Sequence, residues 1–258
     1  MEKITSKNND LIKSIKKLLS SSKERKEKNC FVLEGARLVF DALHSFCTVK
    51  CFLITESAFE KNQQSAEKMI DRADNSYFIS NDIAERLGDT KSSQGVFAVC
   101  EMQETDYCFN ADDRLIALDN VQDPGNLGTI LRTAEALGIH AVIVGGGCDV
   151  YNPKVLRASM GSVLRIAVAQ SDALADELQA LKNKGFAVYG TVPDSLAKSI
   201  TDIHFGGGAV CVIGNEANGI SDDVKKVCSE LVTIKMLGNA ESLNASVAAS
   251  ITMWEMLR

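Results

Sequence analysis

The chain has 258 residues, 45% of them hydrophobic, and a mean hydropathy close to zero. This length allows two domains, and the composition excludes a disordered protein because it can bury a substantial core. The amino terminus is polar, and no apolar run approaches the roughly 20 residues that a membrane-spanning helix needs. We therefore expect a soluble, cytoplasmic protein with no membrane partner.

The net charge of −6 is unevenly distributed along the chain. Residues 1–28 hold nine basic and four acidic side chains, a local charge of +5, whereas the rest of the chain holds 19 basic and 30 acidic ones, or −11. A basic arm on an acidic body is compatible with binding of an RNA phosphate backbone at one end only. The alternative is a solvated amphipathic helix, because Leu11, Ile15, Leu18 and Leu19 recur at helical spacing.

Eight cysteines occur without a Cys-x-x-Cys pair and without a histidine at ligand-like spacing. Cys30, Cys51, Cys100 and Cys211 lie in apolar, strand-like runs, where a reduced cysteine packs as a small hydrophobic residue. We expect neither a disulfide framework nor a bound metal.

Strand-like and helix-like segments alternate over the first hundred residues, which predicts a small α/β domain. After the basic helix, strands are expected at 30–35, 49–55, 77–80 and 95–100, and helices at 37–46 and 57–72. The polar segment that follows has no period and predicts a linker. The expected division is a domain at 1–104, a linker at 105–113 and a domain at 114–258.

The second domain shows the same alternation, with mainly buried strands joined by helices. This pattern is typical of an open, mostly parallel sheet, whose ligand sites lie beyond the carboxyl ends of the strands. The expected strands are 115–118, 141–144, 163–169, 186–191, 209–213 and 231–234. The expected helices are 126–138, 153–160, 172–184, 222–229 and 243–257.

The loop after the first of these strands contains a Pro-Gly turn and a candidate for binding chemistry. Asn126 is placed to cap the following helix through its side-chain oxygen, which is a purely structural role. Arg132 points away from the buried stripe of that helix. It is either a solvated surface residue or a guanidinium that clamps a phosphate or ribose beside the cleft.

Two later loops also follow buried strands. Glu216 lies between two glycines at the mouth of one strand, where a buried carboxylate needs a partner, and Arg132 is the nearest candidate. The helix at 243–257 begins with several small residues, so other backbones, a cofactor or a symmetry mate can approach it closely. A plain core helix does not explain the Glu-Ser-Leu-Asn sequence that precedes it, 241–244.

Together these loops resemble the three motifs of the SpoU/TrmH family of RNA 2′-O-methyltransferases, which belong to the SPOUT class. The motifs are Asp123-Pro124-x-Asn126-x-Gly128 through Arg132, Gly214-Asn215-Glu216-x-x-Gly219-Ile220-Ser221, and Ile234-x-Met236 through Ser242-Leu243-Asn244. Ala217 and Lys235 depart from the family pattern, which places glycine and proline there. The amino-terminal part is similar to the substrate-binding domain that accompanies many members, at Phe31-Val32-Leu33-Glu34-Gly35-x-Arg37 and Gln94-Gly95-Val96.

The resemblance implies a carboxyl-terminal α/β knot, a deep trefoil, preceded by a small α/β domain similar to certain ribosomal proteins. It also implies a homodimer that binds S-adenosyl-L-methionine and RNA. The implied cofactor-binding residues are Gly190, Thr191, Ile213, Gly214, Asn215, Ile234, Met236 and Leu243. The implied catalytic residues are Arg132, Asn126, Glu216, Ser242 and Asn244. With the basic arm, the expected RNA-binding residues are Lys7, Lys13, Lys16, Lys17, Arg25 and Arg37.

The expected function is therefore methyl transfer to a ribose 2′-hydroxyl of ribosomal RNA, with guanosine as the default nucleotide. Transfer RNA remains an alternative substrate, and a non-catalytic RNA-binding ribosome-assembly factor of the same fold is an alternative function. A nicotinamide or nucleotide enzyme is disfavoured, because the glycine runs at 145–147 and 206–208 do not match a Gly-x-Gly-x-x-Gly loop that opens a helix.

Overall fold

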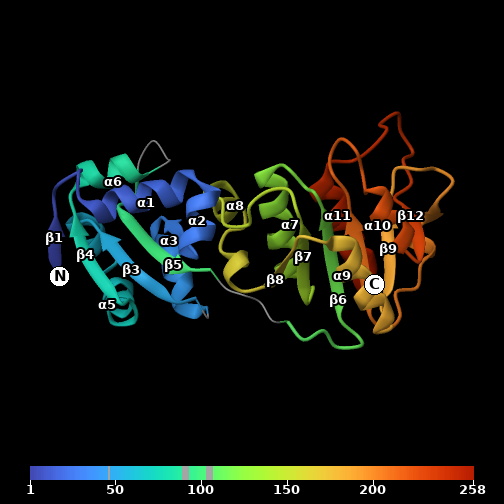
Figure 1. The fold of residues 1–258 in the computed structure, drawn as a ribbon, viewed down its shortest axis with the longest axis horizontal. Helices are drawn as coiled ribbons and strands as arrows, with labels where there is room; N and C mark the ends of the chain where they lie inside the picture. Colours follow the sequence, from blue (N-terminus) through green and yellow to red (C-terminus); the bar gives the residue numbers. More distant parts are fainter. Residues whose placement is uncertain (46, 89–92, 103–106) are drawn as a thin grey trace. The chain divides into compact units, whose positions relative to one another are not determined.

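The computed structural model describes residues 1–45, 47–88, 93–102 and 107–258. Contacts within the chain divide it into two compact units, whose elements are labelled in Figure 1. Unit 1 comprises Met1–Gln103 and Tyr151–Arg165, and unit 2 comprises Glu104–Val150 and Ile166–Arg258. The segment Tyr151–Arg165, which we expected in the domain at 114–258, therefore belongs to unit 1.

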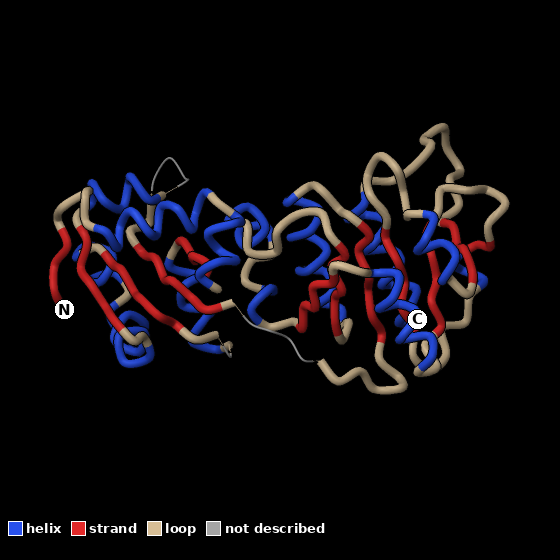
Figure 2. The backbone as a smooth tube through the Cα atoms, viewed as in Figure 1, coloured by secondary structure: helices blue, strands red, loops and turns tan. Residues whose placement is uncertain are grey.

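Unit 1 is built on a mixed five-stranded sheet with the order β1-β4-β3-β5-β2. Strand β5 runs antiparallel to both of its neighbours, and the remaining pairs are parallel. Figure 2 shows helices along both faces of this sheet. The strands are β1 (Glu2–Ile4), β2 (Cys30–Glu34), β3 (Val49–Ile54), β4 (Asn75–Ile79) and β5 (Val96–Glu101). The helices before residue 103 are α1 (Asp10–Ser20), α2 (Ser22–Lys28), α3 (Ala36–Asp41), α4 (Glu56–Lys61), α5 (Gln63–Arg72), α6 (Asn81–Leu87) and the 3-10 turn η1 (Ala42–His44).

The helix expected at 57–72 is interrupted at Asn62. The Asn62 side chain donates a hydrogen bond to the Ala58 carbonyl oxygen at 2.8 Å, so a side chain takes the place of a backbone donor at the end of α4. A new helix, α5, then begins at Gln63. The helix expected at 37–46 ends in η1, and residue 46 lies outside the described residues.

One core of unit 1 packs α1 and α6 against one face of the sheet. Ile12 and Ile15 of α1 meet Ile83 of α6 there, together with alternate residues of the strands such as Val32 and Leu53. The amphipathic pattern of α1 thus buries its apolar stripe and leaves its lysines at the surface.

Arg25, which we expected to bind RNA, is instead a structural residue. Its side chain is only 3% exposed, and Nη1 donates to the carbonyl oxygens of Leu18 and Leu19 at the end of α1. The last carbonyls of a helix have no partners within that helix, and a guanidinium satisfies them well. Arg25 therefore joins α2 to α1 and is not available to a ligand.

The segment Tyr151–Arg165 packs on strand β2 of unit 1. The ring of Tyr151 stacks on that of Phe31 with centroids 4.5 Å apart, and Arg157 lies 3.8 Å from the Glu34 carboxylate. Its helices are α8 (Pro153–Ala158) and the 3-10 turn η2 (Ser162–Leu164). The strand expected at 163–169 is therefore misplaced: its first residues form η2, and strand β8 begins only at Ala167.

Unit 2 contains a seven-stranded sheet in which every adjacent pair is parallel, with the order β10-β12-β9-β11-β6-β7-β8. The expected α/β class with a mostly parallel sheet is confirmed, and the trefoil knot stays a prediction. The strands are β6 (Arg114–Asp119), β7 (Ala141–Gly145), β8 (Ala167–Ser171), β9 (Ala187–Thr191), β10 (Lys198–Ser199), β11 (Ala209–Ile213) and β12 (Glu230–Thr233). The helices are α7 (Pro124–Leu137), α9 (Leu174–Asn183), α10 (Asp222–Val227), α11 (Ala245–Leu257) and the 3-10 turn η3 (Ile200–Asp202).

Helices pack on the sheet of unit 2 as two groups. Helices α9 and α10 contact each other and share a core with the central strands, to which Leu178 and Val224 contribute. Helices α7 and α11 pack together and contribute a further layer (Figure 1). Because all the strands are parallel, their carboxyl ends meet at one edge, and the loops that follow β6, β9, β11 and β12 gather there.

The described part of the expected linker, 107–113, is an ordered part of unit 2, whereas residues 105 and 106 lie outside the described residues. Phe109 packs against Phe186, and the Asp113 carboxylate accepts hydrogen bonds from the Tyr107 hydroxyl and the Asn110 backbone N–H. Across the described ranges, no helix is both long and apolar enough to span a membrane.

Candidate functional site

A cavity of about 780 Å³ opens at the edge of unit 2 where the parallel strands end. Its volume falls within the roughly 300–1,000 Å³ that is usual for small-molecule sites. It is formed by the loops after β9, β11 and β12 and by the start of α11. Seven of the eight expected cofactor-binding residues line it: Thr191, Ile213, Gly214, Asn215, Ile234, Met236 and Leu243.

The eighth expected residue, Gly190, is not among the lining residues. A Cβ atom at this position would lie 2.7 Å from Cδ1 of Ile220 and 2.8 Å from Sγ of Cys228. The glycine therefore lets β9 pack closely against Ile220 and Cys228, and a part for it in cofactor binding stays a prediction.

The loop after β11 is a tight hairpin whose backbone faces the cavity. Asn215 and Gly219 exchange backbone hydrogen bonds of 3.0 and 2.9 Å, and Gly219 has a φ of +67°, which favours glycine. A Cβ atom on Gly214 would come within 2.2 Å of the backbone carbon of Gly219. Both glycines that frame this loop are thus required by its shape.

Three polar side chains, one from each sequence motif, form a continuous chain of hydrogen bonds. The Asn126 side-chain amide donates to Oε1 of Glu216 at 2.8 Å, and the Asn244 amide donates to Oδ1 of Asn126 at 2.9 Å. Asn244 in turn accepts at Oδ1 from the backbone N–H groups of Ser246 and Val247. These side chains therefore connect the first turn of α7 with the loop after β11 and with the start of α11.

The charge state of Glu216 determines which groups donate and which accept along this series of hydrogen bonds. Burial raises the pKa of the carboxyl, but hydrogen bonds from the Asn126 side chain and from the backbone N–H groups of Gln122 and Asp123 outweigh it and hold the pKa below its ordinary value. An ionised carboxylate only accepts hydrogen bonds, so the amide nitrogen of Asn126 must face Glu216 and its oxygen must face Asn244.

Asn126 does not cap its helix, contrary to our expectation. The cap is Asp123, whose side chain accepts from the Asn126 backbone N–H at 2.9 Å, and Pro124 occupies the first turn of α7. Asn126 lies one turn further along, 8% exposed, with its side chain free to bridge Glu216 and Asn244.

Arg132 lies on the exposed side of α7, as expected, but it does not meet Glu216. Arg132 follows Asn126 by six positions, which places it well around the helix from the side that faces the Glu216 loop. Glu216 itself is exposed and takes its hydrogen bonds from Asn126 and from the backbone of Gln122 and Asp123. Among the described residues, Arg132 forms no ion pair, so the expected Arg132–Glu216 contact is wrong.

The remaining expected catalytic residue, Ser242, lines the cavity, and so do several residues that the sequence did not single out. Asp194 follows β9, and Lys225 lies on α10, one helical turn after Ser221. Of the two departures from the family pattern, Ala217 lines the cavity, whereas Lys235 is not among the lining residues although its two neighbours are.

The residues of the cavity fit S-adenosylmethionine. Apolar side chains such as Ile213, Ile234 and Leu243 provide surface for a flat base, and Gly214 and Asn215 at the start of the hairpin line the same cavity. Asp194 and Lys225 provide charges of both signs, which suits the amino and carboxyl groups of the methionine end. The cavity can therefore hold a small molecule that is both apolar and zwitterionic.

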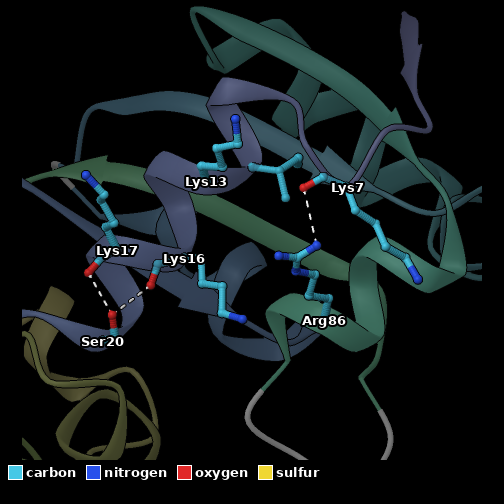
Figure 3. Close-up of a pocket in the computed structure, with 7 residues that line it drawn as sticks. Lys7, Lys13, Lys16, Lys17, Ser20 and Arg86 are labelled. Atoms are coloured by element: carbon cyan, nitrogen blue, oxygen red, sulfur yellow. Dashed lines mark hydrogen bonds between the residues drawn. The ribbon is translucent and has the colours of Figure 1, made fainter.

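The lysines of the basic arm lie on unit 1, at a distinct cavity. Lys7, Lys13, Lys16 and Lys17 line it together with Arg86, which the sequence reasoning missed (Figure 3). The helix that carries Arg86, α6, was not predicted, so no signal placed it near α1. Arg37 is exposed on α3 and is not among the residues that line this cavity.

Comparison with known proteins assigns both parts of the chain. Residues 113–254 match the SpoU rRNA Methylase family, and residues 9–98 match the MRM3-like substrate binding domain. The chain is 34% identical to the 23S rRNA (guanosine(2553)-2'-O)-methyltransferase RlmP of Bacillus subtilis, over 99% of both chains.

Solved structures of similar proteins agree with this assignment. An AdoMet-bound rRNA methyltransferase from Sinorhizobium meliloti matches with a TM-score of 0.88 and 29% identity, over 99% of this chain and 97% of the other. The SpoU methyltransferase AviRb from Streptomyces viridochromogenes, in complex with AdoMet, matches with a TM-score of 0.86 and 27% identity over 97% of each chain. The chain therefore belongs to the SpoU rRNA methylase family and is an RNA methyltransferase that uses S-adenosylmethionine.

Proposed function

We propose that the protein methylates the ribose 2′-hydroxyl of a guanosine in large-subunit ribosomal RNA, in the cytoplasm. The observation that carries the proposal is the series of hydrogen bonds from Glu216 through Asn126 to Asn244, which ties the first motif to the two motif loops that line the cavity. The substrate follows from the similarity to RlmP, which extends over the full chain and so includes unit 1. A non-catalytic binder of the same fold would not need these polar residues.

In this proposal the cavity residues hold the cofactor, which supplies an electrophilic methyl group when bound. Thr191, the hairpin after β11 and Leu243 form its walls. Asn126 and Asn244 fix the loops that face the ribose, and Ser242 hydrogen-bonds near the reacting centre. An arginine stays protonated at neutral pH, so Arg132 positions a phosphate group of the RNA rather than removing the hydroxyl proton itself.

We also propose that the protein is a homodimer in which a second copy covers α11. Trp254 is 63% exposed and Val247 is 45% exposed, and their spacing of seven residues puts them on one face of the helix. Arg132 lies on α7, which packs beside α11, so the partner would lie close to this arginine. Sedimentation equilibrium of the wild-type protein should give the mass of two chains, and the mass of one chain would exclude this arrangement.

The proposed reaction is tested by transfer of labelled methyl from S-adenosylmethionine to unmodified ribosomal and transfer RNA pools. We expect label in ribosomal RNA that survives removal of the base. Arg132→Ala should lower the rate roughly a hundredfold because the reacting ribose is no longer aligned. Lys184→Ala, which removes an exposed charge elsewhere on unit 2, should have no effect.

Two other outcomes would favour the alternatives. Label only in transfer RNA would change the substrate class while leaving the reaction intact. No label in either pool, despite measurable binding of cofactor and RNA, would indicate a non-catalytic RNA-binding protein.

A further inference from the structure

We propose that the cavity between α1 and α6 of unit 1 binds a phosphodiester group of the RNA, with Lys16 and Arg86 as its direct contacts. The inference deepens the proposed function, because it rests on RNA being the substrate. It names a site on unit 1 at which the RNA backbone is held, apart from the cofactor cavity of unit 2.

The cavity is concave and strongly cationic. It has a volume of about 150 Å³, enough for a phosphate group or several waters. The residues that line it are Lys7, Ile12, Lys13, Lys16, Lys17, Ser20 and Arg86. Five of these seven residues are cations and none carries a carboxylate, so every charge on the lining itself is positive.

Three of the five cations are engaged with acids at the rim. Lys7 pairs with Asp82 at 3.1 Å and Lys13 with Asp10 at 3.2 Å. Lys17 lies 3.7 Å from the Glu24 carboxylate. These are exposed pairs that contribute little to stability, and they leave the middle of the cavity to the other two cations.

Lys16 and Arg86 have no acidic partner among the residues the structure describes. Within the described ranges, the one hydrogen bond of the Arg86 guanidinium is to the Lys7 carbonyl oxygen, at a long 3.5 Å. In Figure 3 the two side chains extend from α1 and α6 into the same space. Two like charges that line one small cavity without a counter-ion repel each other, and a bound anion removes that cost.

The shape and rigidity of the site favour a phosphate. Ile12 and Ile15 anchor α1 in the core, and Ile83 and Leu87 anchor α6, so both cations stand on fixed elements. A guanidinium binds two phosphate oxygens in parallel, and an ammonium adds a point charge. Burial of the apolar face explains why α1 is amphipathic, but it does not explain why cations from two helices line one cavity.

RNA is favoured over an acidic protein as the ligand. Residues 9–98, which include every residue that lines the cavity except Lys7, match a substrate-binding domain, and the chain is an RNA methyltransferase. The net charge of −11 outside residues 1–28 would oppose a polyanion over most of the surface. A local cationic cavity therefore also serves to orient the RNA toward unit 1.

The test is the double variant Lys16→Gln/Arg86→Gln compared with the control Lys26→Gln/Lys68→Gln. The control removes the same charge from exposed positions of α2 and α5 that do not line the cavity. Affinity for an unmodified large-subunit ribosomal RNA transcript is measured between 50 and 300 mM salt. The KM for RNA, the KM for S-adenosylmethionine and kcat are measured with the same proteins.

We expect the cavity variant to bind RNA roughly tenfold or more weakly at about 0.1 M salt, and the slope of log affinity against log salt to become about 2 shallower. Its kcat and its KM for S-adenosylmethionine should match those of the wild type. Its unfolding temperature should also be unchanged, because both substituted side chains are exposed, as are those of the control. The control should retain the wild-type affinity and slope. An unchanged affinity and slope in the cavity variant would overturn the inference and leave an acidic protein as the remaining ligand class.

The two proposals fail in different ways. If wild-type protein methylates ribosomal RNA and the cavity variant behaves like the control, only the phosphate site is wrong. If the wild type does not methylate ribosomal RNA at all, the proposed function is wrong, and the salt dependence of binding is then judged with whichever RNA pool accepts label.

Discussion

The Glu216 carboxylate accepts three hydrogen bonds, and an amide of the same shape cannot replace it. Oε2 accepts from the Gln122 backbone N–H at 3.1 Å, and Oε1 accepts from Asp123 and from the Asn126 side chain. A glutamine has only one oxygen, so its NH₂ group must face a donor on one side. The loop after β6 and the hairpin after β11 therefore depend on the charge of this residue.

We predict that Glu216→Gln lowers the free energy of unfolding of unit 2 by about 1 kcal/mol, since one donor loses its partner at a partly exposed site. Affinity for S-adenosylmethionine should fall with it, because the hairpin lines the cavity. Urea unfolding followed by the fluorescence of Trp254, the single tryptophan, and calorimetric binding measure the two effects. Glu241→Gln, an exposed acid of the third motif, is the control.

The stability difference between wild type and Glu216→Gln should depend on pH. The pKa of folded Glu216 lies below its unfolded value of about 4.3, so its stabilisation is fully present above that pH and is lost as the pH falls through the folded pKa. Glutamine does not titrate. The difference in unfolding free energy between wild type and Glu216→Gln should therefore be constant from pH 7 to about 5 and narrow below. A difference that persists unchanged to pH 3 would mean that the carboxylate makes no such contribution.

The residue that begins helix α11 also belongs to the hydrogen bonds of the site. Asn244 caps the helix with its oxygen and reaches Asn126 with its nitrogen, and the orientation of the amide is fixed from both ends. One residue thus has two separable roles. A substitution that preserves the cap but changes the nitrogen removes only the link to Asn126.

We predict that Asn244→Asp keeps the thermal unfolding temperature near that of the wild type, since aspartate caps as well as asparagine. Its second oxygen would face Oδ1 of Asn126, which cannot turn because its nitrogen is held by Glu216. Methyl transfer should then fall at least about tenfold through misalignment. Asn244→Ala, in contrast, should lose about 1 kcal/mol of stability as well. If Asn244→Asp transferred methyl at the wild-type rate, the link to Asn126 would have no functional role.

The periodicity of the sequence predicted most elements because long apolar runs bury both faces of parallel strands, as in β7 and β11. It missed β1, which is three residues long, and α6, which is seven. At Asn126 the sequence predicted a cap because Asn is a common capping residue, but Asp123 with Pro124 begins the helix earlier. Side-chain partners such as Glu216 and Asn126 are 90 residues apart, and no local pattern specifies them.

At the scale of the whole molecule, the order of residues along the chain does not give the division into units. The segment Tyr151–Arg165 lies inside the methyltransferase sequence, yet its contacts are with β2 and α3 of unit 1. Such contacts join residues more than a hundred positions apart and are invisible to local patterning. Unit 1 is therefore incomplete without a segment that follows β7.

This dependence leads to a prediction about local stability. Tyr151→Ala removes a ring that stacks on Phe31 at 4.5 Å and is 9% exposed, which should cost unit 1 about 3 kcal/mol. Hydrogen exchange of backbone amides measures each unit separately, because protection reports local and subglobal opening. Amides of β2 and β5 should exchange faster in Tyr151→Ala than in the wild type, whereas those of β6 and β11 should exchange at the wild-type rate.

The matched control is Tyr107→Ala, which removes a ring whose centroid lies 5.0 Å from that of Phe109 in unit 2. In this variant the amides of β6 and β11 should exchange faster, and those of β2 and β5 should not. Equal loss of protection in both units from either variant would mean that the chain unfolds as a single body and that Tyr151–Arg165 is not a distinct part of unit 1.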